Sequence, residues 1–226
     1  FVHDAVARGA VAILTDAAGA LSVREQVVHL MTSHPRLAHA KLAAAFYAPL
    51  PETLVAVTGT NGKTSTVSFA SQFWNATGTR AASIGTLGIH GGGIEIDGSL
   101  TTPDASALSR NLNMLHNAGI HHVALEASSH GIDQKRLDGL SFKAAGFTYL
   151  GRDHLDYHGT LDRYFGAKTG LFNRLLSPTG TAVLNLDADH YNALAKIVRS
   201  RSLNLLTYGQ DKKADLRLVK TTPLPE

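Results

Sequence analysis

The stretch VAVTGTNGKTSTVSF, residues 55–69, constrains the fold of this chain more than any other part of its sequence. An apolar, β-branched run ends at Val57 and leads into a glycine-rich turn, and a helical pattern begins near Gly62. The successive backbone N–H groups of such a turn, with a helix N-terminus behind them, form a concave array of donors for phosphate oxygens. Lys63 adds a positive charge for the outer phosphates, and the Thr64 hydroxyl is placed to bind Mg²⁺. The sequence therefore predicts a site for an Mg²⁺-bound nucleotide.

The loop is a compact variant of the usual phosphate-binding pattern, G-x-x-x-x-G-K-[ST]. That pattern would have a glycine where this chain has Val57, and the first glycine here lies only three positions before the second. The alternative is a glycine-rich turn that carries a surface lysine, but the strand before it and the helix after it favour a nucleotide site. The residues expected to hold the nucleotide are Gly59, Thr60, Asn61, Gly62, Lys63 and Thr64.

Strand-like and helix-like segments alternate along the chain. Strands are expected at residues 11–14, 54–57, 81–86, 122–125, 144–149, 181–185 and 203–208. Helices are expected at residues 34–47, 62–76, 104–118, 161–176 and 188–200. This alternation predicts an α/β fold in which the phosphate-binding loop, a P-loop, belongs to a mostly parallel sheet with helices on both faces.

A domain boundary is expected at YAPLPET, residues 47–53, where two prolines interrupt a helical pattern just before the phosphate-loop strand. Residues 1–48 would then be the remnant of a small α/β N-terminal domain with a linker helix, and residues 49–226 the nucleotide-binding domain. The chain opens within a helical pattern that includes Phe1, and it closes with LRLVKTTPLPE, a strand-like run followed by a proline-rich stop. We therefore expect the natural protein to continue beyond these residues.

Composition excludes several classes of function. The chain has no cysteine, which excludes disulfides, thiolate metal sites and a cysteine nucleophile. Its formal net charge of +3 arises from 21 basic and 18 acidic residues without a long basic run, so nucleic acid is not an expected partner. No apolar run approaches the ~20 residues of a membrane helix, and no secretory signal pattern opens the chain. We expect a cytoplasmic monomer that binds small anions and no membrane.

The turn LTTPDA, residues 100–105, carries two hydroxyl side chains just before an expected helix. Thr102 or Asp104 is placed to cap the N-terminus of that helix. Taken alone, the turn is explained by capping chemistry.

The segment VALEASSHGIDQKR, residues 123–136, ends an apolar strand in Glu126. A carboxylate at the carboxyl end of a parallel strand lies at the rim where open α/β sheets bind their ligands. Because Mg²⁺ accepts one or two carboxylates beside phosphate oxygens, Glu126 is predicted to ligate it. The alternative is that Glu126 interacts with the N-terminus of the following helix.

The segment FTYLGRDHLDYHGTLDRYFGAK, residues 147–168, repeats this layout of an apolar strand followed by polar residues. Asp153, His154, Asp156 and His158 lie within six positions and are able to hold a divalent metal, although adjacent Asp and His residues often only hydrogen-bond each other. Without cysteine a structural zinc site is disfavoured, and a second Mg²⁺ site is the prediction.

Together these motifs resemble the Mur ligase family, ATP-dependent enzymes that add amino acids to the peptide of the peptidoglycan precursor. The combination of GTNGKT, TTPD, EASSHG, RDHLDYHG and YF-x-AK, in this order, is similar to the branch (MurE type) that extends UDP-N-acetylmuramoyl-L-alanyl-D-glutamate by the third residue. The resemblance covers nearly the whole chain. It implies that residues 1–48 are the end of the uridine-nucleotide-binding domain, that residues 49–226 are the central ATP-binding domain, and that the C-terminal domain is absent.

The resemblance also implies roles for individual residues. Thr64 and Glu126 would ligate the first Mg²⁺, and His154 would approach the second. Lys168 matches a lysine that this family carbamylates to bridge the metals; without the resemblance it would be read as a solvated surface lysine. Lys63, Glu126, His154 and Lys168 would thus serve catalysis. The positions that match contacts to the UDP-muramoyl dipeptide are Thr101, Thr102, Ser128, Gln134 and Arg136.

Two positions depart from the family pattern. Tyr149 stands where an asparagine is usual, and His34 stands where Asp or Asn often precedes the Pro-Arg of the linker. The polar contact expected beside the metals is therefore in question at Tyr149.

The implied reaction is the ATP-dependent formation of an amide through an acyl phosphate, with meso-diaminopimelate or L-lysine as the third residue. ATP and Mg²⁺ are the implied cofactors, and the fragment alone is expected to be inactive. The alternatives are another Mur or folylpolyglutamate-type ligase, which the threonine after Lys63 disfavours, and a nucleotide-binding module without catalysis.

Overall fold

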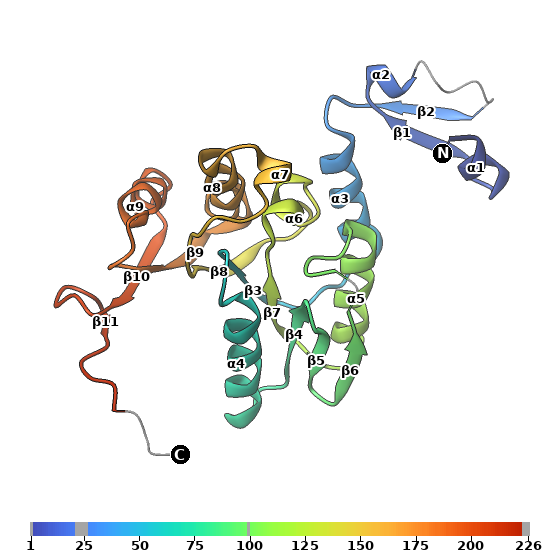
Figure 1. Cartoon of the computed structure of the whole chain (residues 1–226). Coiled ribbons are helices and arrows are strands. Elements are labelled where there is room, and N and C mark those ends of the chain that lie inside the picture. Colours follow the sequence, from blue (N-terminus) through green and yellow to red (C-terminus); the bar gives the residue numbers. More distant parts are fainter. Residues whose placement is uncertain (1, 21–26, 99, 223–226) are drawn as a thin grey trace.

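The computed structural model describes residues 2–20, 27–98 and 100–222. Within them, a nine-stranded sheet has the spatial order β11-β10-β9-β8-β3-β7-β4-β5-β6 (Figure 1). Its strands are β3 (Thr53–Thr58), β4 (Ala81–Gly85), β5 (Gly88–Gly91), β6 (Ile94–Asp97), β7 (His122–Glu126), β8 (Phe142–Phe147), β9 (Leu176–Asn185), β10 (Asn204–Gly209) and β11 (Leu216–Arg217). All neighbouring strands pair in parallel except β4 with β5 and β5 with β6, which are antiparallel. The expected mostly parallel sheet is confirmed.

Helices cover both faces of this sheet. They are α4 (Lys63–Ala76), α5 (Ala105–Asn117), α6 (Ser129–Asp133), α7 (Leu155–His158), α8 (Leu161–Gly170), the π-helical turn η1 (Leu171–Leu175) and α9 (Tyr191–Ser200). Side chains alternate along β3, so Val57 packs against Val67 of α4, whereas Leu54 joins the larger core with Leu108 of α5 and Phe172 of η1. Figure 1 accordingly shows α4 on the opposite side of the sheet from α8 and α9.

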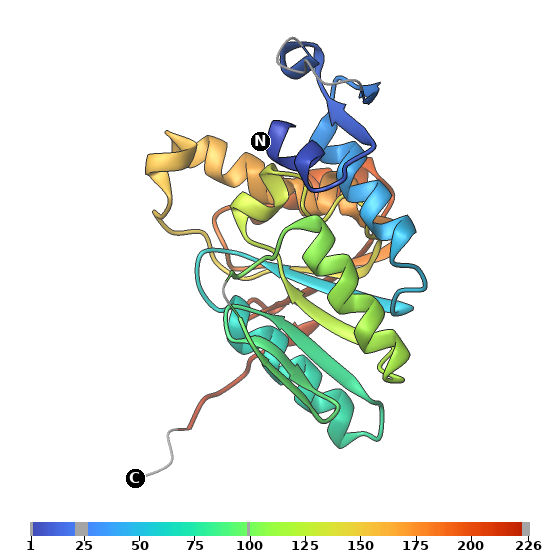
Figure 2. The same ribbon diagram turned by 90° about the vertical axis from the view of Figure 1, so that its right-hand side faces the viewer.

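The N-terminal residues form a small separate layer. The strands β1 (Ala12–Thr15) and β2 (Val28–Met31) pair in parallel beside the helices α1 (Val2–Ala7) and α2 (Ala17–Ala20). The helix α3 (Pro35–Phe46) connects this layer to the sheet domain and lies beside α5 (Figure 2). No residue of α1, β1, α2 or β2 is buried, so α3 is the main support of this part of the chain.

The helix α3 packs through small groups. Its alanines Ala40 and Ala43 are buried against Ala105 of α5. A Cβ atom on Gly139 would overlap the backbone carbonyl of Ala40, so the two backbones approach closely here. Pro35 at the first helical position favours the start of the helix, because its missing N–H would have no partner there.

Most predicted elements are present. Several differ in extent, and β2, α2, α6 and α7 were not predicted. The helix predicted over 161–176 ends at Gly170, because the chain makes the turn η1 and enters β9 at Leu176. The strand predicted over 144–149 lies at Phe142–Phe147, so Tyr149 follows it in a loop. The hairpin of β5 and β6 was not predicted, since its many glycines disfavour strands.

Close backbone approach explains why glycines build that hairpin. Gly88 has φ 104° and Gly91 has φ 124°, and a Cβ atom on either would overlap a neighbouring backbone carbonyl.

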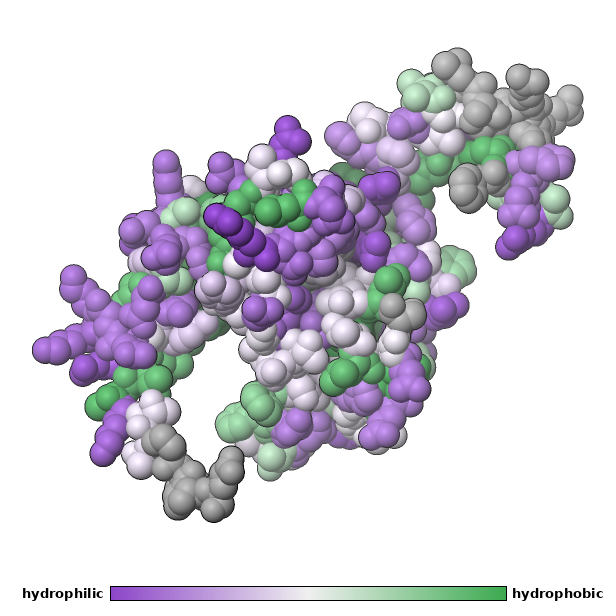
Figure 3. All heavy atoms as spheres, in the orientation of Figure 1, coloured by the Kyte–Doolittle hydropathy of each residue, from purple (hydrophilic) through white to green (hydrophobic). Residues whose placement is uncertain are grey.

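At the chain ends, α1 confirms the expected N-terminal helical pattern, of which Phe1 lies outside the described residues. The final strand is confirmed only as β11, and residues 223–226 of the proline-rich stop lie outside the described part. Every helix within the described residues is too short or too polar to cross a membrane. Apolar side chains are scattered over the face shown in Figure 3 and form no single patch on it.

Packing of α5 against the sheet is expected to contribute most of the stability on the face of the sheet that α5 covers. Leu112 is fully buried there, and Leu112→Ala should lower the free energy of unfolding by about 3 kcal/mol through lost burial and a residual cavity. Leu42 on α3 is 56% exposed, so Leu42→Ala should change it by less than about 0.5 kcal/mol. Urea unfolding of both variants measures the difference; equal effects would contradict this description of the core.

Candidate active site

The P-loop connects the end of β3 to the start of α4. Gly59 has φ 144° and Gly62 has φ 84°, conformations that residues with a side chain rarely adopt. A Cβ atom on Gly59 would also overlap the hydroxyl of Thr148, which follows β8. That hydroxyl donates to the carbonyl of Asn61 at 2.6 Å. The loop is therefore held from the side by the neighbouring strand, a contact that the sequence did not reveal.

Lys63 folds back over the loop from the first turn of α4. Its Nζ donates to the carbonyls of Gly59 and Thr60 at 2.9 and 2.8 Å. Burial lowers the pKa of this ammonium, and the carboxylates of Glu126 and Asp153 partly offset that effect. Lys63 thus lies inside the loop that was predicted to hold phosphates.

Lys168 reaches the same loop from α8 and is only 1% exposed. Its Nζ donates to the carbonyl of Gly59 at 2.8 Å and lies 4.4 Å from the centre of the Tyr164 ring. Burial, followed by the nearby charge of Lys63, lowers the pKa of Lys168 from its ordinary value of 10.5 to about 7. The interpretation of Lys168 as a solvated surface lysine is therefore wrong, and its amine is substantially uncharged near neutral pH.

Tyr164 connects Lys168 to the loop. Its hydroxyl lies 3.2 Å from the hydroxyl of Thr60, which also accepts a hydrogen bond from the N–H of Gly151 at 2.8 Å. Tyr164 is four residues before Lys168, one turn along the same helix face. That spacing is a signal that sequence reasoning missed.

Glu126 ends β7, the strand next to β3, and pairs with Val57 in the register of the sheet. Its side chain is 2% exposed, and its Oε1 accepts from the N–H of Thr86 at 2.9 Å. A Cβ atom on Gly85 would overlap this carboxylate, so Gly85 makes room for it. Helix α6 is capped by Ser128 instead, whose hydroxyl accepts from the N–H of Gly131, so the helix-partner alternative for Glu126 is not observed.

The donor set around Glu126 suits Mg²⁺. Among the described residues, no cation lies within 4 Å of the Glu126 carboxylate to form an ion pair, and an unpaired buried carboxylate is costly. Thr64 and Glu126 both line a cavity of about 250 Å³ beside the N-terminus of α4. A hydroxyl and a carboxylate next to a phosphate-binding loop are ligands that Mg²⁺ accepts. Both residues therefore fit the metal expected of them.

The polar residues after β8 do not converge as a ligand set. The Nε2 of His154 lies 3.4 Å from a carboxylate oxygen of Asp153, whereas His158 is buried against Tyr164. No group of three His, Cys, Asp or Glu side chains within residues 2–20, 27–98 and 100–222 is arranged to hold a metal. A second Mg²⁺ at His154 would need a further ligand, and this role of His154 stays a prediction.

Three imidazoles nevertheless gather near the loop. The ring of His130 lies 4.7 Å from that of His154 and 5.5 Å from that of His158. Burial, together with the neighbouring imidazoles, lowers the pKa of His130 and of His158. Both are therefore neutral near pH 7.

Four of the five residues predicted to contact the muramoyl substrate are hydrogen-bonded to one another beside Glu126, and Thr101, next to Thr102 in the chain, completes this patch. The Thr102 hydroxyl donates to the carbonyl of Glu126 at 2.8 Å and accepts from the N–H of Ser128 at 3.0 Å. Arg136 donates to the carbonyl of Thr102 at 2.6 Å and to the amide oxygen of Gln134 at 2.7 Å. The structure therefore brings these side chains together.

The fifth member of the patch, Thr101, lies with its hydroxyl 2.9 Å from that of Thr86. Asp104 caps the N-terminus of α5, and its carboxylate accepts from the backbone N–H groups of Ser106 and Ala107. Asp104 and not Thr102 is therefore the cap, while the Thr102 hydroxyl bonds to Glu126 and Ser128 and the Thr101 hydroxyl bonds to Thr86.

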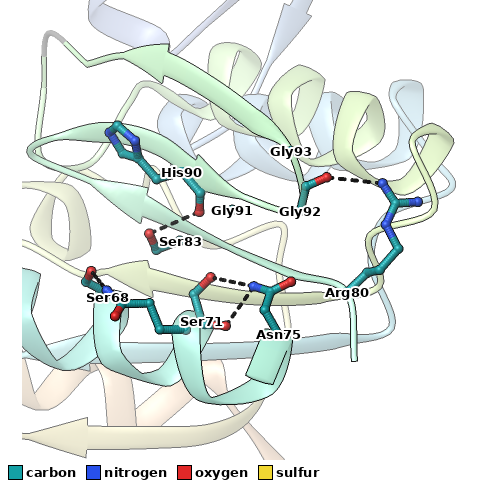
Figure 4. Close-up of a pocket in the computed structure, with 10 residues that line it drawn as sticks. Ser68, Ser71, Asn75, Arg80, Ser83, His90, Gly91, Gly92 and Gly93 are labelled. Carbon is teal, nitrogen blue, oxygen red and sulfur yellow. Dashed lines mark hydrogen bonds between the residues drawn. The ribbon is translucent and has the colours of Figure 1, made fainter. Parts of the chain in front are cut away.

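A larger cavity, of about 580 Å³, adjoins the one that Thr64 and Glu126 line and lies between the far half of α4 and the β5–β6 hairpin (Figure 4). Its polar side chains bond to one another or to nearby backbone. Asn75 binds Ser71 and Ala81, Arg80 donates to the carbonyl of Gly92, and Ser83 donates to that of His90. Because these groups are already satisfied, the cavity offers a ligand few polar partners.

These features define a class of protein: a P-loop domain of α/β fold that places a buried carboxylate and a buried lysine beside the phosphate-binding loop. Comparison with known proteins identifies the family. Residues 57–223 match the family model for the Mur ligase middle domain, and the chain belongs to the Mur ligase family.

A curated relative from Zymomonas mobilis named UDP-N-acetylmuramoyl-L-alanyl-D-glutamate--2,6-diaminopimelate ligase is 45% identical over 219 residues, covering 97% of this chain and 44% of that protein. A solved structure of a ligase with the same name has a TM-score of 0.82 and 32% identity, covering 95% of this chain and 43% of that one. The chain thus spans less than half the length of these relatives. A bifunctional folylpolyglutamate synthase/dihydrofolate synthase, with a TM-score of 0.60 and 18% identity over 76% of this chain and 47% of its own, shares the fold alone.

The pH dependence of stability is expected to report the buried amine of Lys168. Between pH 7 and 10.5 the unfolded chain holds a proton at Lys168 that the folded chain lacks. The free energy of unfolding therefore rises with pH over this range, and the contribution of Lys168 is lost as the pH falls toward 7. This contribution approaches about 1.4 kcal/mol per pH unit and should be absent in Lys168→Met. Urea unfolding of both proteins in CO₂-free buffer from pH 7.5 to 10 measures it; parallel profiles would show that the lysine is charged when folded.

Proposed function

We propose that this protein, at its natural length, is an ATP-dependent amide ligase that extends UDP-N-acetylmuramoyl-L-alanyl-D-glutamate by one amino acid in peptidoglycan precursor synthesis. The observation that carries the proposal is the meeting of three groups at one edge of the sheet: the P-loop with Lys63, the buried carboxylate of Glu126, and the patch that includes Thr101 and Arg136. The first two suit Mg·ATP, and the third suits a second, polar substrate.

The reaction would begin with attack of the substrate carboxylate on the γ-phosphate of ATP, which gives an acyl phosphate and ADP. The amine of the incoming amino acid would then displace phosphate through a tetrahedral intermediate. Phosphoryl transfer depends on positioning and charge neutralisation, and it requires no side-chain nucleophile. This agrees with a site whose reactive groups are amines, a carboxylate and hydroxyls.

In this mechanism the side chains orient the substrates and neutralise the charge of the phosphates. Lys63 would turn from the loop carbonyls to the outer phosphates, and the P-loop N–H groups would bind their oxygens. Thr64 and Glu126 would hold Mg²⁺, which supplies charge neutralisation for the phosphates when bound. Arg136 uses three of its five N–H donors within the patch, so two remain for substrate.

We propose that Lys168 acts as a carbamate. A neutral amine attacks CO₂, forms an N–C bond and loses a proton, and the product is an anion. The lowered pKa of Lys168 supports this, because a substantial fraction of the amine is neutral near pH 7. A carbamate would add oxygen ligands to those of the Asp153 carboxylate, beside His154, for a second Mg²⁺.

The third amino acid is proposed to be 2,6-diaminopimelate, because the curated relatives from Zymomonas mobilis and Agrobacterium fabrum carry that substrate in their names. Residues 1–48 would belong to the uridine-nucleotide domain, and a C-terminal domain would bind the incoming amino acid. The site of action is proposed to be the cytoplasm, where ATP is available, and the protein is proposed to be a monomer.

Two rivals are a different amide ligase of this architecture and a nucleotide-binding module without catalysis. The likeness to a folylpolyglutamate synthase is one of fold, and the patch of Thr102, Ser128 and Arg136 favours the muramoyl dipeptide. Formation of the UDP-linked tripeptide from ATP, UDP-N-acetylmuramoyl-L-alanyl-D-glutamate and diaminopimelate would distinguish the three. ADP release only with a folate substrate, or nucleotide binding without ADP release, would support a rival.

Glu126→Gln should lower the rate of tripeptide formation at least about a hundredfold, because the amide keeps the shape of the side chain and removes the charge that holds Mg²⁺. Glu52→Gln is the matched control, since Glu52 is exposed and far from the loop in the fold. Product formation by chromatography at saturating ATP measures both. Wild-type turnover in Glu126→Gln would remove Glu126 from the metal site.

Lys168→Ala should be nearly inactive and partly restored by acetate, a small carboxylate that replaces the carbamate. Lys168→Arg should stay inactive with acetate, because the guanidinium fills the space and keeps its positive charge. Turnover with and without acetate measures both, and a mass increase of one CO₂ on the native protein checks the modification. Wild-type turnover of Lys168→Ala at ordinary Mg²⁺ concentration would contradict the carbamate.

A further inference from the structure

Thr86 stands between the two halves of the candidate active site. It is the first residue after β4 and is exposed to solvent, in the turn that leads to β5. One side of it faces Glu126, the carboxylate assigned to Mg²⁺, and the other faces Thr101 in the substrate patch. The sequence motifs did not single it out.

Thr86 holds Glu126 with two groups. Its backbone N–H donates to Oε1 at 2.9 Å, and its hydroxyl reaches Oε2 at 3.4 Å. A hydrogen bond to a ligating carboxylate fixes its orientation and tunes its affinity for metal. The N–H contact is independent of the side chain, so a substitution at Thr86 removes only the hydroxyl contact.

The same hydroxyl also bonds to Thr101. The two oxygens lie 2.9 Å apart, a shorter contact than the one to Glu126. A hydroxyl has one hydrogen and can donate it to only one of these two acceptors at a time. The choice depends on the charge at Oε2 of Glu126, since an ionised carboxylate is the stronger acceptor.

Thr101 is followed in the chain by Thr102, which is bonded to Ser128 and Arg136 of the patch. Its neighbour Thr102 donates to the backbone carbonyl of Glu126 and receives Arg136 on its own carbonyl. The hydroxyl of Thr101 therefore lies in a turn that is held by the hydrogen bonds of Thr102 to Glu126 and to Arg136.

We propose that Thr86 is a positioning residue that couples metal binding to substrate binding. A cation at Glu126 withdraws charge from Oε2, so the hydroxyl hydrogen of Thr86 turns to Thr101. The hydroxyl of Thr101 then has its own hydrogen free to donate to the substrate. Binding of either ligand thereby raises the affinity for the other, as linkage requires. The identity of the substrate rests on the proposed function, whereas the contact between Thr86 and the metal carboxylate does not.

The test compares Thr86→Val with Thr86→Ser in the protein at its natural length. Valine keeps the shape and the backbone N–H but removes the hydroxyl, whereas serine keeps the hydroxyl and the N–H but lacks the methyl group. Mn²⁺ binding is measured by electron paramagnetic resonance with a non-hydrolysable ATP analogue, with and without UDP-N-acetylmuramoyl-L-alanyl-D-glutamate. Thr77→Val, an exposed threonine at the far end of α4, is the control.

In the wild-type protein the UDP-linked dipeptide should raise the affinity for Mn²⁺ about fivefold. Thr86→Val should reduce this coupling to less than about twofold, because valine cannot pass a change at Glu126 on to Thr101. Its affinity for Mn²⁺ without the dipeptide should not fall, since the hydroxyl leaves Oε2 when the cation binds. Thr86→Ser and Thr77→Val should behave as wild type. Unchanged coupling in Thr86→Val would overturn the proposal, as would an equal loss of coupling in Thr86→Ser.

The two proposals fail separately. If the wild-type protein binds Mn²⁺ and nucleotide but makes no tripeptide, the proposed function fails, while coupling to the UDP-linked dipeptide that is lost in Thr86→Val still supports the role of Thr86. If tripeptide forms and Thr86→Val keeps the wild-type coupling, the function stands and Thr86 has no positioning role.

Discussion

The carbonyl oxygen of Gly59 accepts hydrogen bonds from two lysine amines, and the organisation of the site depends on that shared acceptor. Lys63 reaches it from the helix that the P-loop begins, and Lys168 reaches it from a helix more than a hundred residues later in the chain. A side chain on Gly59 would overlap the hydroxyl of Thr148. The two amines share one acceptor, and the charge of Lys63 contributes to the lowered pKa of Lys168.

The carboxylate of Glu126, on the neighbouring strand β7, acts on the amine of Lys63 in the opposite sense. Glu126 is buried without an ion pair among the described residues, and its charge raises the pKa of Lys63 against the effect of burial. The domain thus places a buried carboxylate, a buried amine and a half-buried amine around a loop whose backbone groups carry dipoles. Such a site is unfavourable by itself and becomes favourable when a polyanion with its metal is bound, because each group then has a partner.

Sequence reasoning located the loop, the strand end at Glu126 and the alternation of strands and helices, since each follows from a local pattern. It identified the substrate patch and Lys168 only through resemblance to a family. Burial of Lys168 depends on which face of α8 meets the P-loop, and the spacing of Tyr164 and Lys168 was the only local sign of it. No local sequence pattern indicated Thr86, because its contacts depend on three segments that meet only in the folded structure.

The alanine contact of α3 has a mechanical consequence. The helix is 12 residues long, about 18 Å, and it contacts α5 through the small side chains of Ala40 and Ala43 and through a hydrogen bond between His39 and Ser106. The strands β1 and β2 lie beyond the N-terminal end of this helix. From Ala40 to Pro35 the helix extends about 7.5 Å, so a tilt of about 10° about the alanine contact would move that end by about 1.3 Å. Because small groups make the contact, it restrains the orientation of β1 and β2 less than long interlocking side chains would.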